Sequence, residues 1–360
     1  MKNSYLTAGI TLSRLFKLLF RNKVTLTPQT FGRLLFLIQS SLWSSVFAVF
    51  EKIVYHRQIQ KMKAPEDPVF IVGHWRTGST FLHQLMNLDP GLMTPTLFQV
   101  AVPDGFLTSY PYYKPLLKHV ISKKRPMDNV KLGMDEPQED EYAIYRITDC
   151  SPLERLVFPK TPTYFLLDCD KYLPAKTESE EWKNNVVYFF KKLSFKSGKT
   201  IVSKNPFNSM RIPLLAAMFP KAKFIHIVRH PYHVIPSTIH MWDIVQRQNC
   251  LNKNTHCPTI DEVVTVFDSM LNILEKDFQA LSPDRHLLIR YEDLENQPVR
   301  ILEDVYKKFG MPFSSAFRNN INRFLEDTKE YEKNSFPIQP GSREIIRQRM
   351  QHHMRHFGYD

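Results

Sequence analysis

Residues 68–80 read PVFIVGHWRTGST, and this stretch decides the expected fold. It opens with the apolar residues 69–72, a run short enough for a buried strand. Gly73 and Gly78 follow, separated by four residues, and the helical pattern of residues 79–88 comes next. A strand, a glycine loop and a helix in this order direct backbone N–H groups and the positive end of a helix dipole at an anion. The stretch therefore predicts a phosphate-binding loop at the end of a strand.

The loop departs from the pattern of nucleotide triphosphatases. That pattern places Lys and then Ser or Thr after the second glycine, whereas here Ser79 takes the Lys position and Thr80 follows. Arg76, inside the loop, supplies positive charge instead. A P-loop kinase is one alternative, but it would need the missing lysine and Mg²⁺ ligands, so the loop favours a ligand without a γ-phosphate. The other alternative is a tight turn that only caps a helix, a role that does not require Arg76.

Short apolar stretches alternate with helical patterns along the rest of the chain. The expected strands are residues 69–72, 200–203, 223–228 and 286–290, and the expected helices are residues 79–88, 209–219, 232–245 and 298–309. This alternation predicts an α/β fold, P-loop-like and three-layered, with a mainly parallel central sheet and helices on both faces. Residues 90–195, rich in Pro, Tyr and Lys, are expected to be an insertion.

A second anion-binding motif follows the third expected strand. The segment KFIHIVRHPYHVIPST, residues 223–238, places Arg229 at the end of that strand and Pro231 at the start of a helix, a position that suits proline. Ser237 lies eight residues after Arg229, about two helical turns along. An Arg at the carboxyl edge of a parallel sheet and a Ser on the next helix can hold one phosphate from two sides.

These two motifs, in this order, resemble the PAPS-dependent sulfotransferases, which use 3′-phosphoadenosine 5′-phosphosulfate (PAPS) as the sulfuryl donor. The family's 5′-phosphosulfate loop resembles WRTGST, residues 75–80, and its 3′-phosphate site resembles the pair Arg229 and Ser237. The segment GHWRTGSTFLHQLMNLDP, residues 73–90, is most similar in sequence to a bacterial branch of the family. The resemblance covers about residues 68–310, with gaps in the insertion, and implies PAPS as co-substrate.

The resemblance also implies individual site residues. The implied cofactor-binding residues are Arg76, Thr77, Gly78, Ser79, Thr80, Phe81, Arg229, Ser237 and Tyr291. Lys204, in SKNP, matches a lysine that approaches the transferred group, while Phe81 and Tyr291 match aromatics near the adenine. A solvated strand end is the alternative for Lys204, and core packing is the alternative for the two aromatics. The family's C-terminal glycine-rich loop has no clear match, and Lys333 and Arg343 are candidates for the 3′-phosphate side.

Sulfuryl transfer resembles phosphoryl transfer, in which positioning and fixed positive charge do most of the work. Arg76 and Lys204 are therefore expected to stabilise the group in transfer and the leaving phosphate. No metal is expected, because the histidines at positions 352, 353 and 356 lack the carboxylate or Cys spacing of a metal site.

A base must take the proton of the acceptor. The candidates lie in MDEPQEDEYAIYRIT, residues 134–148, where a helix starting at Pro137 would bring three carboxylates to one face. The three are Glu136, Glu139 and Asp140, with Glu139 preferred as the catalytic base. The alternative is that these acidic residues only complement the helix dipole. His74 and His83, beside the loop, are the next candidates.

The composition of the chain limits the classes of binding partner and the cellular compartment that we expect for the protein. The chain carries 48 Lys and Arg against 36 Asp and Glu, a formal charge of +12 that favours anionic partners. It has no run of five basic residues and no zinc-finger spacing, so we expect no nucleic-acid binding. Four cysteines without a CxxC pair and the lack of a signal-peptide pattern favour the reducing cytoplasm.

Residues 1–60 differ from the expected sulfotransferase domain, residues 61–360. They hold two apolar stretches with basic flanks, residues 12–20 and 34–50. The second is uncharged for 17 residues but contains Gln39 and four serines, which is short and polar for a spanning helix. We expect an amphipathic helical segment that attaches peripherally to the inner membrane face. Packing of these helices on the main domain is the alternative.

The acceptor and the oligomeric state stay open. The insertion at residues 90–195 is expected to bind the acceptor, and its aromatic residues suit a lipophilic alcohol such as a sterol or lipid. The available aromatics are Phe98, Phe106, Tyr110, Tyr112, Tyr113, Phe158, Tyr164 and Phe165. A carbohydrate or glycolipid would also stack on aromatics and remains an alternative. A non-catalytic anion- or membrane-binding protein would not need two phosphate sites.

Overall fold

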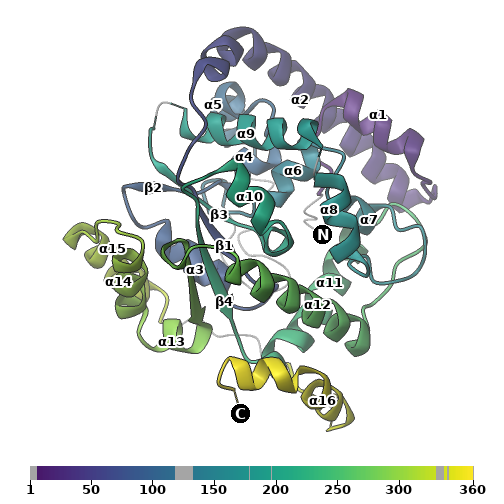
Figure 1. Ribbon diagram of the computed structural model, residues 1–360. Helices are drawn as coiled ribbons and strands as arrows, with labels where there is room; N and C mark the ends of the chain where they lie inside the picture. The colour runs from purple at the N-terminus through teal and green to yellow at the C-terminus, as the bar shows by residue number, and fades with distance from the viewer. Residues whose placement is uncertain are drawn as a thin grey trace. The chain divides into compact units, whose positions relative to one another are not determined.

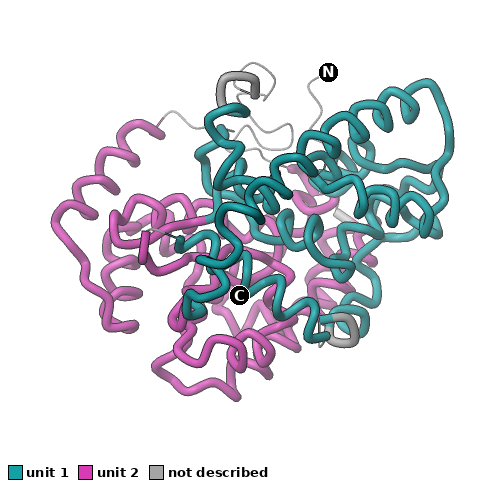
Figure 2. The backbone as a smooth tube through the Cα atoms, turned by 90° about the horizontal axis from the view of Figure 1, so that it is seen from above, with its two compact units in different colours: residues 1–64, 95–196, 240–258 teal, residues 65–94, 197–239, 259–360 magenta. Residues whose placement is uncertain are grey.

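The computed structural model (Figure 1) describes residues 6–117, 133–177, 179–195, 197–329, 336–338 and 340–359. The chain divides into two compact units (Figure 2). Unit 1 comprises Met1–Ala64, Pro95–Lys196 and His240–Pro258, and unit 2 comprises Pro65–Thr94, Ser197–Ile239 and Thr259–Asp360. The amino-terminal segment and most of the expected insertion therefore belong to unit 1, while both motifs expected to bind phosphate belong to unit 2.

Unit 2 is built on a parallel sheet. Its described residues form five strands in the order β2-β3-β1-β4-β5, with every neighbouring pair parallel. The strands are β1 (Val69–Val72), β2 (Leu92–Met93), β3 (Thr200–Lys204), β4 (Lys223–Val228) and β5 (His286–Arg290). Four of these match the expected strands, so the predicted α/β fold with a mainly parallel sheet is confirmed. The edge strand β2 was missed because two residues are too few to show a period.

Helices follow each of the longer strands. They are α3 (Ser79–Met86), η1 (Pro206–Met210), α10 (Ile212–Met218), α11 (Pro231–Asn249), α12 (Ile260–Gln279), η2 (Pro283–Arg285), α13 (Tyr291–Asn296), α14 (Pro298–Lys308), α15 (Ser315–Asp327) and α16 (Pro340–His356). The helix expected at residues 209–219 is split into η1 and α10. Each of the two begins with a proline in its first turn, where the missing N–H costs little.

Consecutive residues of β4 show that both faces of the sheet are covered. Ile227 belongs to a core cluster that includes Leu302 of α14. His226 points to the opposite face, where its ring lies 5.7 Å from that of Phe278 in α12. Strand side chains alternate between the two faces, so α14 and α12 lie on opposite sides. The three-layer arrangement predicted from the sequence is therefore confirmed (Figure 1).

Unit 1 is helical in its described residues. Its helices are α1 (Leu12–Arg21), α2 (Pro28–Lys61), α4 (Leu97–Ala101), α5 (Phe106–Leu117), α6 (Glu141–Ile147), α7 (Leu153–Val157), α8 (Cys169–Thr177) and α9 (Glu180–Ser194), and it shares α11 with unit 2. Both apolar stretches of the amino-terminal segment are helical. A capping box of Thr27 and Thr30 starts α2, because each hydroxyl accepts from the backbone N–H of the other residue.

Candidate functional site

The expected phosphate-binding loop follows β1 in unit 2, and its first glycine is required by the fold. Gly73 has φ 135°, and a Cβ there would lie 2.5 Å from the carbonyl oxygen of Ile227. Its N–H donates to the hydroxyl of Ser209 in η1, at 2.8 Å. Ser209 therefore anchors the start of the loop. Sequence reasoning missed this residue, because the contact joins positions 136 residues apart.

The second glycine brings the loop against an aromatic ring. Gly78 has φ 89°, and a Cβ there would lie 2.0 Å from the ring of Tyr291. Ser79 and Thr80 begin α3 directly after it. The first N–H groups of a helix have no intrahelical partner and suit an anion. Thr77 is buried and donates its hydroxyl to the carbonyl oxygen of His74, at 2.7 Å, so it helps to hold the turn.

Arg76 connects the two motifs. Its φ of 68° lies in the left-handed region, which a residue other than glycine adopts only where its surroundings hold it. Its Nε donates to the hydroxyl of Ser237 in α11, at 2.8 Å. The loop after β1 and the helix after β4 therefore meet at these two side chains.

Arg229 completes the cluster. Its guanidinium lies 4.4 Å from the centroid of the Tyr291 ring, and its Nη1 donates to the carbonyl oxygen of Arg76 at 3.5 Å. The cation–π contact orients the guanidinium. Arg76, Arg229, Ser237 and Tyr291 thus form one cluster at the carboxyl edge of the sheet, with two guanidinium groups suited to phosphate oxygens.

Lys204 lies at the same edge. It ends β3 in register with Ile71 of β1, and the carboxyl ends of parallel strands share one edge of the sheet. Its side chain is only 2% exposed, so it is not a solvated strand end. Its charge, after the larger effect of burial, helps to lower the pKa of His83 to about 3.

The two aromatics implied for the adenine both take part in the core. Tyr291 belongs to the cluster under the sheet, and Phe81 packs against that cluster. The hydroxyl of Tyr291 donates to Glu295. Contact of either ring with an adenine stays a prediction.

The buried histidines are poor candidates for the catalytic base. Burial lowers the pKa of His74 to about 4, and that of His226 to about 3. Burial also lowers the pKa of His83, to about 3. A general base works best when its pKa lies near the working pH. The fallback choice of His74 or His83 is therefore disfavoured.

The helix expected to start at Pro137 does not form, so that prediction was wrong. Pro137 pairs with Thr96 in an antiparallel bridge, and the N–H of Gln138 donates to the carbonyl oxygen of Pro95 at 2.8 Å. These bonds to the segment before α4 hold the backbone extended. Helix α6 begins only at Glu141.

Consequently the three candidate carboxylates do not share a helix face. The alternative based on the helix dipole still applies to Asp140, which is the N-cap residue of α6. Asp140 and Glu141 are buried, and Glu141 accepts a hydrogen bond from the hydroxyl of Ser151 at 2.7 Å. Glu136 and Glu139 are half-buried. Glu139 belongs to unit 1, and its role as base stays a prediction.

The C-terminal candidates divide between described and masked positions. Arg343 of α16 lies 4.9 Å from the centroid of the Tyr232 ring, whereas Lys333 lies outside the described residues. His353 contacts Asp268 at 3.0 Å and Glu275 at 3.1 Å. No group of His, Cys, Asp or Glu arranged to hold a metal occurs in the part of the chain that the structure describes.

Comparison with known proteins decides the family. Residues 68–315 match the model of the sulfotransferase family, a span that contains both motifs and more than half of the chain. The chain belongs to the sulfotransferase family. It is therefore an enzyme that transfers sulfuryl groups.

Relatives of this sulfotransferase occur in mycobacteria, which agrees with the resemblance to a bacterial branch. The omega-hydroxy-beta-dihydromenaquinone-9 sulfotransferase Stf3 of Mycobacterium tuberculosis and that of Mycobacterium bovis are each 32% identical over 355 residues, covering 99% of this chain and 91% of the relative. Among solved structures, sulfotransferase STF9 of Mycobacterium avium has a TM-score of 0.70 at 15% identity, covering 93% of this chain and 87% of that one. STF1 of Mycobacterium tuberculosis has a TM-score of 0.60 at 13% identity, covering 92% and 88%. These two structures support the fold assignment.

Proposed function

We propose that this sulfotransferase moves the sulfuryl group of PAPS to the hydroxyl of a lipophilic alcohol. PAPS as the sulfuryl donor is supported by one observation, the cluster that joins the two expected phosphate motifs in unit 2. Its members are Arg76, Arg229, Ser237 and Tyr291. The observation that supports the acceptor is the relative Stf3, whose name gives a hydroxylated dihydromenaquinone as its substrate. A carbohydrate or glycolipid acceptor is the alternative.

The cluster has the donors that a phosphosulfate and a 3′-phosphate need. Residues 77–80 would offer backbone N–H groups to the 5′-phosphosulfate, and Arg76 would add charge. Arg229 and Ser237 would bind the 3′-phosphate. The hydroxyl of Ser237 accepts from Arg76, which leaves its own O–H free to donate to a phosphate oxygen. The two sites can therefore act together.

The reaction would be an in-line displacement at sulfur. The acceptor oxygen forms the new S–O bond while the S–O bond to the 5′-phosphate breaks, and the acceptor proton passes to the carboxylate of Glu139. Arg76 and the buried Lys204 would stabilise the charge on the leaving phosphate, a role that fixed cations fill in phosphoryl transfer. The products are the sulfate ester and 3′-phosphoadenosine 5′-phosphate (PAP).

The structure reduces the set of aromatics available to an acceptor. Five of the eight are buried in unit 1 and contribute to its core: Phe98, Phe106, Phe158, Tyr164 and Phe165. Tyr112 is exposed, and Tyr110 and Tyr113 are half-buried. These three tyrosines, all on α5, are the ones that we propose for acceptor contact.

We also propose a cytoplasmic enzyme that attaches peripherally to the inner membrane face, where a lipophilic acceptor would dissolve. Small-molecule or lipid acceptors are its expected partners, without nucleic acid. Helix α2 is long and apolar enough to cross a membrane by length and composition, with only 22% of its most apolar window buried.

Turnover of labelled PAPS over a panel of sterols, phenols, glycolipids and sugars tests the proposed function. We expect transfer to lipophilic alcohols and weaker or no transfer to sugars. We also expect PAP to raise the melting temperature, since a ligand that binds only the folded state stabilises it. Stabilisation by ATP with Mg²⁺ in place of PAP would favour the kinase alternative.

Catalysis is expected to continue without a divalent metal. Arg76 and Lys204 supply the fixed positive charge that a metal ion supplies in many phosphoryl-transfer enzymes, and Ser79 replaces the lysine of the metal-dependent pattern. The measurement is the rate of PAPS-dependent transfer in excess EDTA, which should equal the untreated rate. Loss of activity that only Mg²⁺ restores would contradict this prediction.

A further inference from the structure

Helix α2 of unit 1 carries its apolar side chains on the outside. Of the sixteen large hydrophobic side chains exposed among the described residues, all but Tyr112 and Leu288 fall between residues 16 and 54. A stripe at helical spacing runs along α2, formed by Leu35, Ile38, Leu42, Val46, Val49 and Ile53. Apolar patches this long rarely face water on a soluble monomer.

The buried side of the same helix is largely polar. Arg33 is buried and donates to the carbonyl oxygens of Cys250 at 3.0 Å and Arg247 at 3.3 Å. Glu51 is also buried, forms an ion pair with Lys192, and accepts from the N–H of Leu107 at 2.7 Å. Burial raises the pKa of the Glu51 carboxyl, and the charge of Lys192 opposes that effect. A surface helix of a soluble protein shows the reverse pattern, with its apolar stripe toward the core, so α2 is arranged as a helix that faces hydrocarbon.

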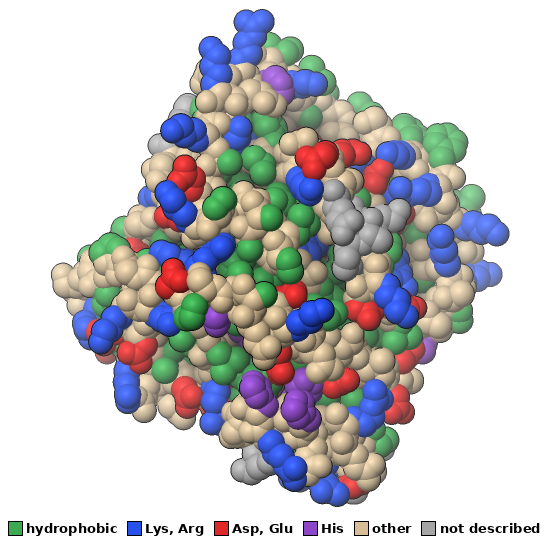
Figure 3. All heavy atoms as spheres, in the orientation of Figure 1, with side chains coloured by type: hydrophobic (Ala, Val, Ile, Leu, Met, Phe, Trp, Pro, Cys, Tyr) green, Lys and Arg blue, Asp and Glu red, His purple; other side chains and the backbone are tan. Residues whose placement is uncertain are grey.

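The charges around this face identify its partner. Residues 1–64 contain ten Lys or Arg and one acidic residue, Glu51, which is buried in its ion pair. The exposed charges of this segment are therefore basic, among them Lys23, Lys52 and Lys61, while Lys17 pairs with Asp149. Figure 3 shows hydrophobic and basic side chains mixed along the upper right edge, where Figure 1 places α1 and α2. An anionic lipid surface complements this pattern, whereas a second copy of the chain would bring like charges together.

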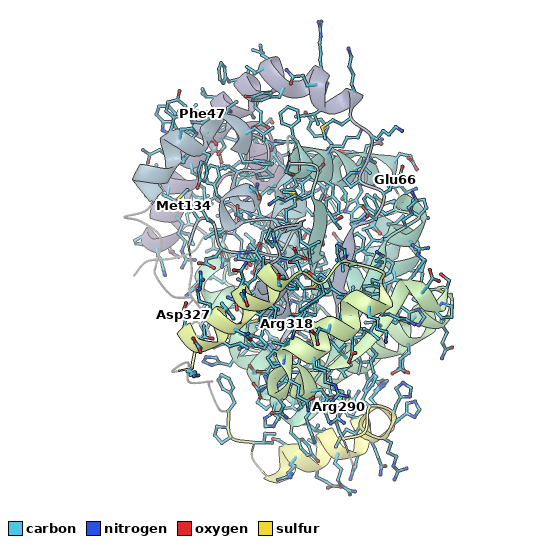
Figure 4. All side chains as sticks on the ribbon, turned by 90° about the vertical axis from the view of Figure 1, so that its left-hand side faces the viewer. Phe47, Glu66, Met134, Arg290, Arg318 and Asp327 are labelled. Atoms are coloured by element: carbon cyan, nitrogen blue, oxygen red, sulfur yellow. The ribbon has the colours of Figure 1, made fainter. Side chains whose placement is uncertain are left out.

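The packing of α2 indicates that it lies in the plane of the membrane. At 1.5 Å per residue, its 34 residues reach about 50 Å, well beyond the roughly 30 Å of a hydrocarbon core. One side packs on α1, α5 and α9, for example through Phe47, whose ring lies 5.7 Å from that of Tyr112 in α5 (Figure 4). A spanning orientation would also place the charged Arg33 and Glu51 at or within the hydrocarbon, which is costly.

We infer that the apolar face of α2, with the exposed Phe16 and Phe20 of α1 beside it, docks the enzyme on one leaflet of an anionic bilayer. Only the role that we assign to this docking, which is to bring the enzyme to a lipid acceptor, rests on the proposed function. Vesicle binding itself does not depend on which acceptor is sulfated.

Flotation of the full-length enzyme with phosphatidylcholine–phosphatidylglycerol vesicles tests this inference. We expect the wild type to float with these vesicles and less with phosphatidylcholine alone. Leu42→Asp, and independently Val49→Asp, should lower the bound fraction about 10-fold or more, because a carboxylate enters the hydrocarbon poorly. Leu288→Asp is the matched control, since Leu288 is 42% exposed, close to the 51% of Leu42, but lies on β5 in unit 2. It should float like the wild type.

Three outcomes would overturn the inference: a wild type that stays unbound, Leu42→Asp and Val49→Asp variants that float normally, or a Leu288→Asp variant that loses binding equally. Sedimentation that shows a dimer converted to a monomer by Leu42→Asp, without vesicle binding, would assign the face to a second copy instead. Turnover on the acceptor panel distinguishes the two proposals. Vesicle binding without transfer to a lipophilic alcohol would defeat the proposed function and leave the membrane face standing.

Discussion

Glu139→Gln is expected to lower kcat by about 10²–10⁴-fold, the usual contribution of a general base, while PAP binding and the melting temperature stay unchanged. Glutamine keeps the shape of the side chain but cannot accept the acceptor's proton. Glu139 is half-buried, whereas the neighbouring carboxylates of Asp140 and Glu141 are buried. Steady-state kinetics with labelled PAPS, together with calorimetry of PAP binding, measures both quantities.

Glu136→Gln is the matched control for that experiment. Glu136 lies three residues away, in the turn that precedes Pro137, and is also half-buried. Asp140→Asn and Glu141→Gln would be poor controls, since both carboxylates are buried and their replacement would disturb packing as well as charge. If Glu136→Gln lowers kcat as much as Glu139→Gln does, the assignment of Glu139 as base fails.

Arg229→Ala is expected to weaken PAP binding by about 2–4 kcal/mol, the cost of removing a charge-assisted partner of a phosphate. Its guanidinium is already positioned over the Tyr291 ring and next to the Arg76 carbonyl oxygen, so little reorganisation is needed to bind the 3′-phosphate. Ser237→Ala should cost less, about 0.5–1.5 kcal/mol, because it removes one neutral hydrogen bond. Isothermal titration calorimetry with PAP gives both affinities.

Arg318→Ala controls for the loss of an arginine stacked on an aromatic ring. Arg318 lies on α15 in unit 2 (Figure 4), its guanidinium is 5.4 Å from the centroid of the Phe313 ring, and we place it in no binding site. It should bind PAP as the wild type does. A folded Arg229→Ala protein with wild-type affinity would contradict the 3′-phosphate assignment.

The elements that could be predicted are those whose pattern is local. The strands at residues 69–72, 223–228 and 286–290 lie where the sequence placed them. The first two are largely buried apolar runs, as is typical of a parallel strand covered on both faces. The loop after β1 was also predictable, since Gly73 and Gly78 need conformations that few other residues adopt. Because β4 pairs in parallel with β1, Arg229 after β4 lies at the same carboxyl edge of the sheet as this loop.

The elements that could not be predicted depend on partners distant in sequence. Pro137 looks like a helix start by local rules, but its segment bonds to the backbone at Pro95 and Thr96. Ser209 supports Gly73 through a contact that no spacing reveals. Competition between local propensity and tertiary hydrogen bonds decides such cases, and the tertiary bonds win where a short segment has few helical bonds to lose.

The amino-acid sequence by itself determined the α/β fold and the family, and it located the two motifs expected to bind phosphate, because strands, glycines and charged loop residues act through their immediate neighbours. Only the tertiary structure decided which side of α2 faces outward. The sequence shows an apolar helix with scattered polar residues, which fits a core helix and a membrane helix equally well. The buried ion pair of Glu51 with Lys192 and the bonds of Arg33 to Cys250 and Arg247 turn the polar side inward, since a buried charge must find its partner, and the apolar side is left outside.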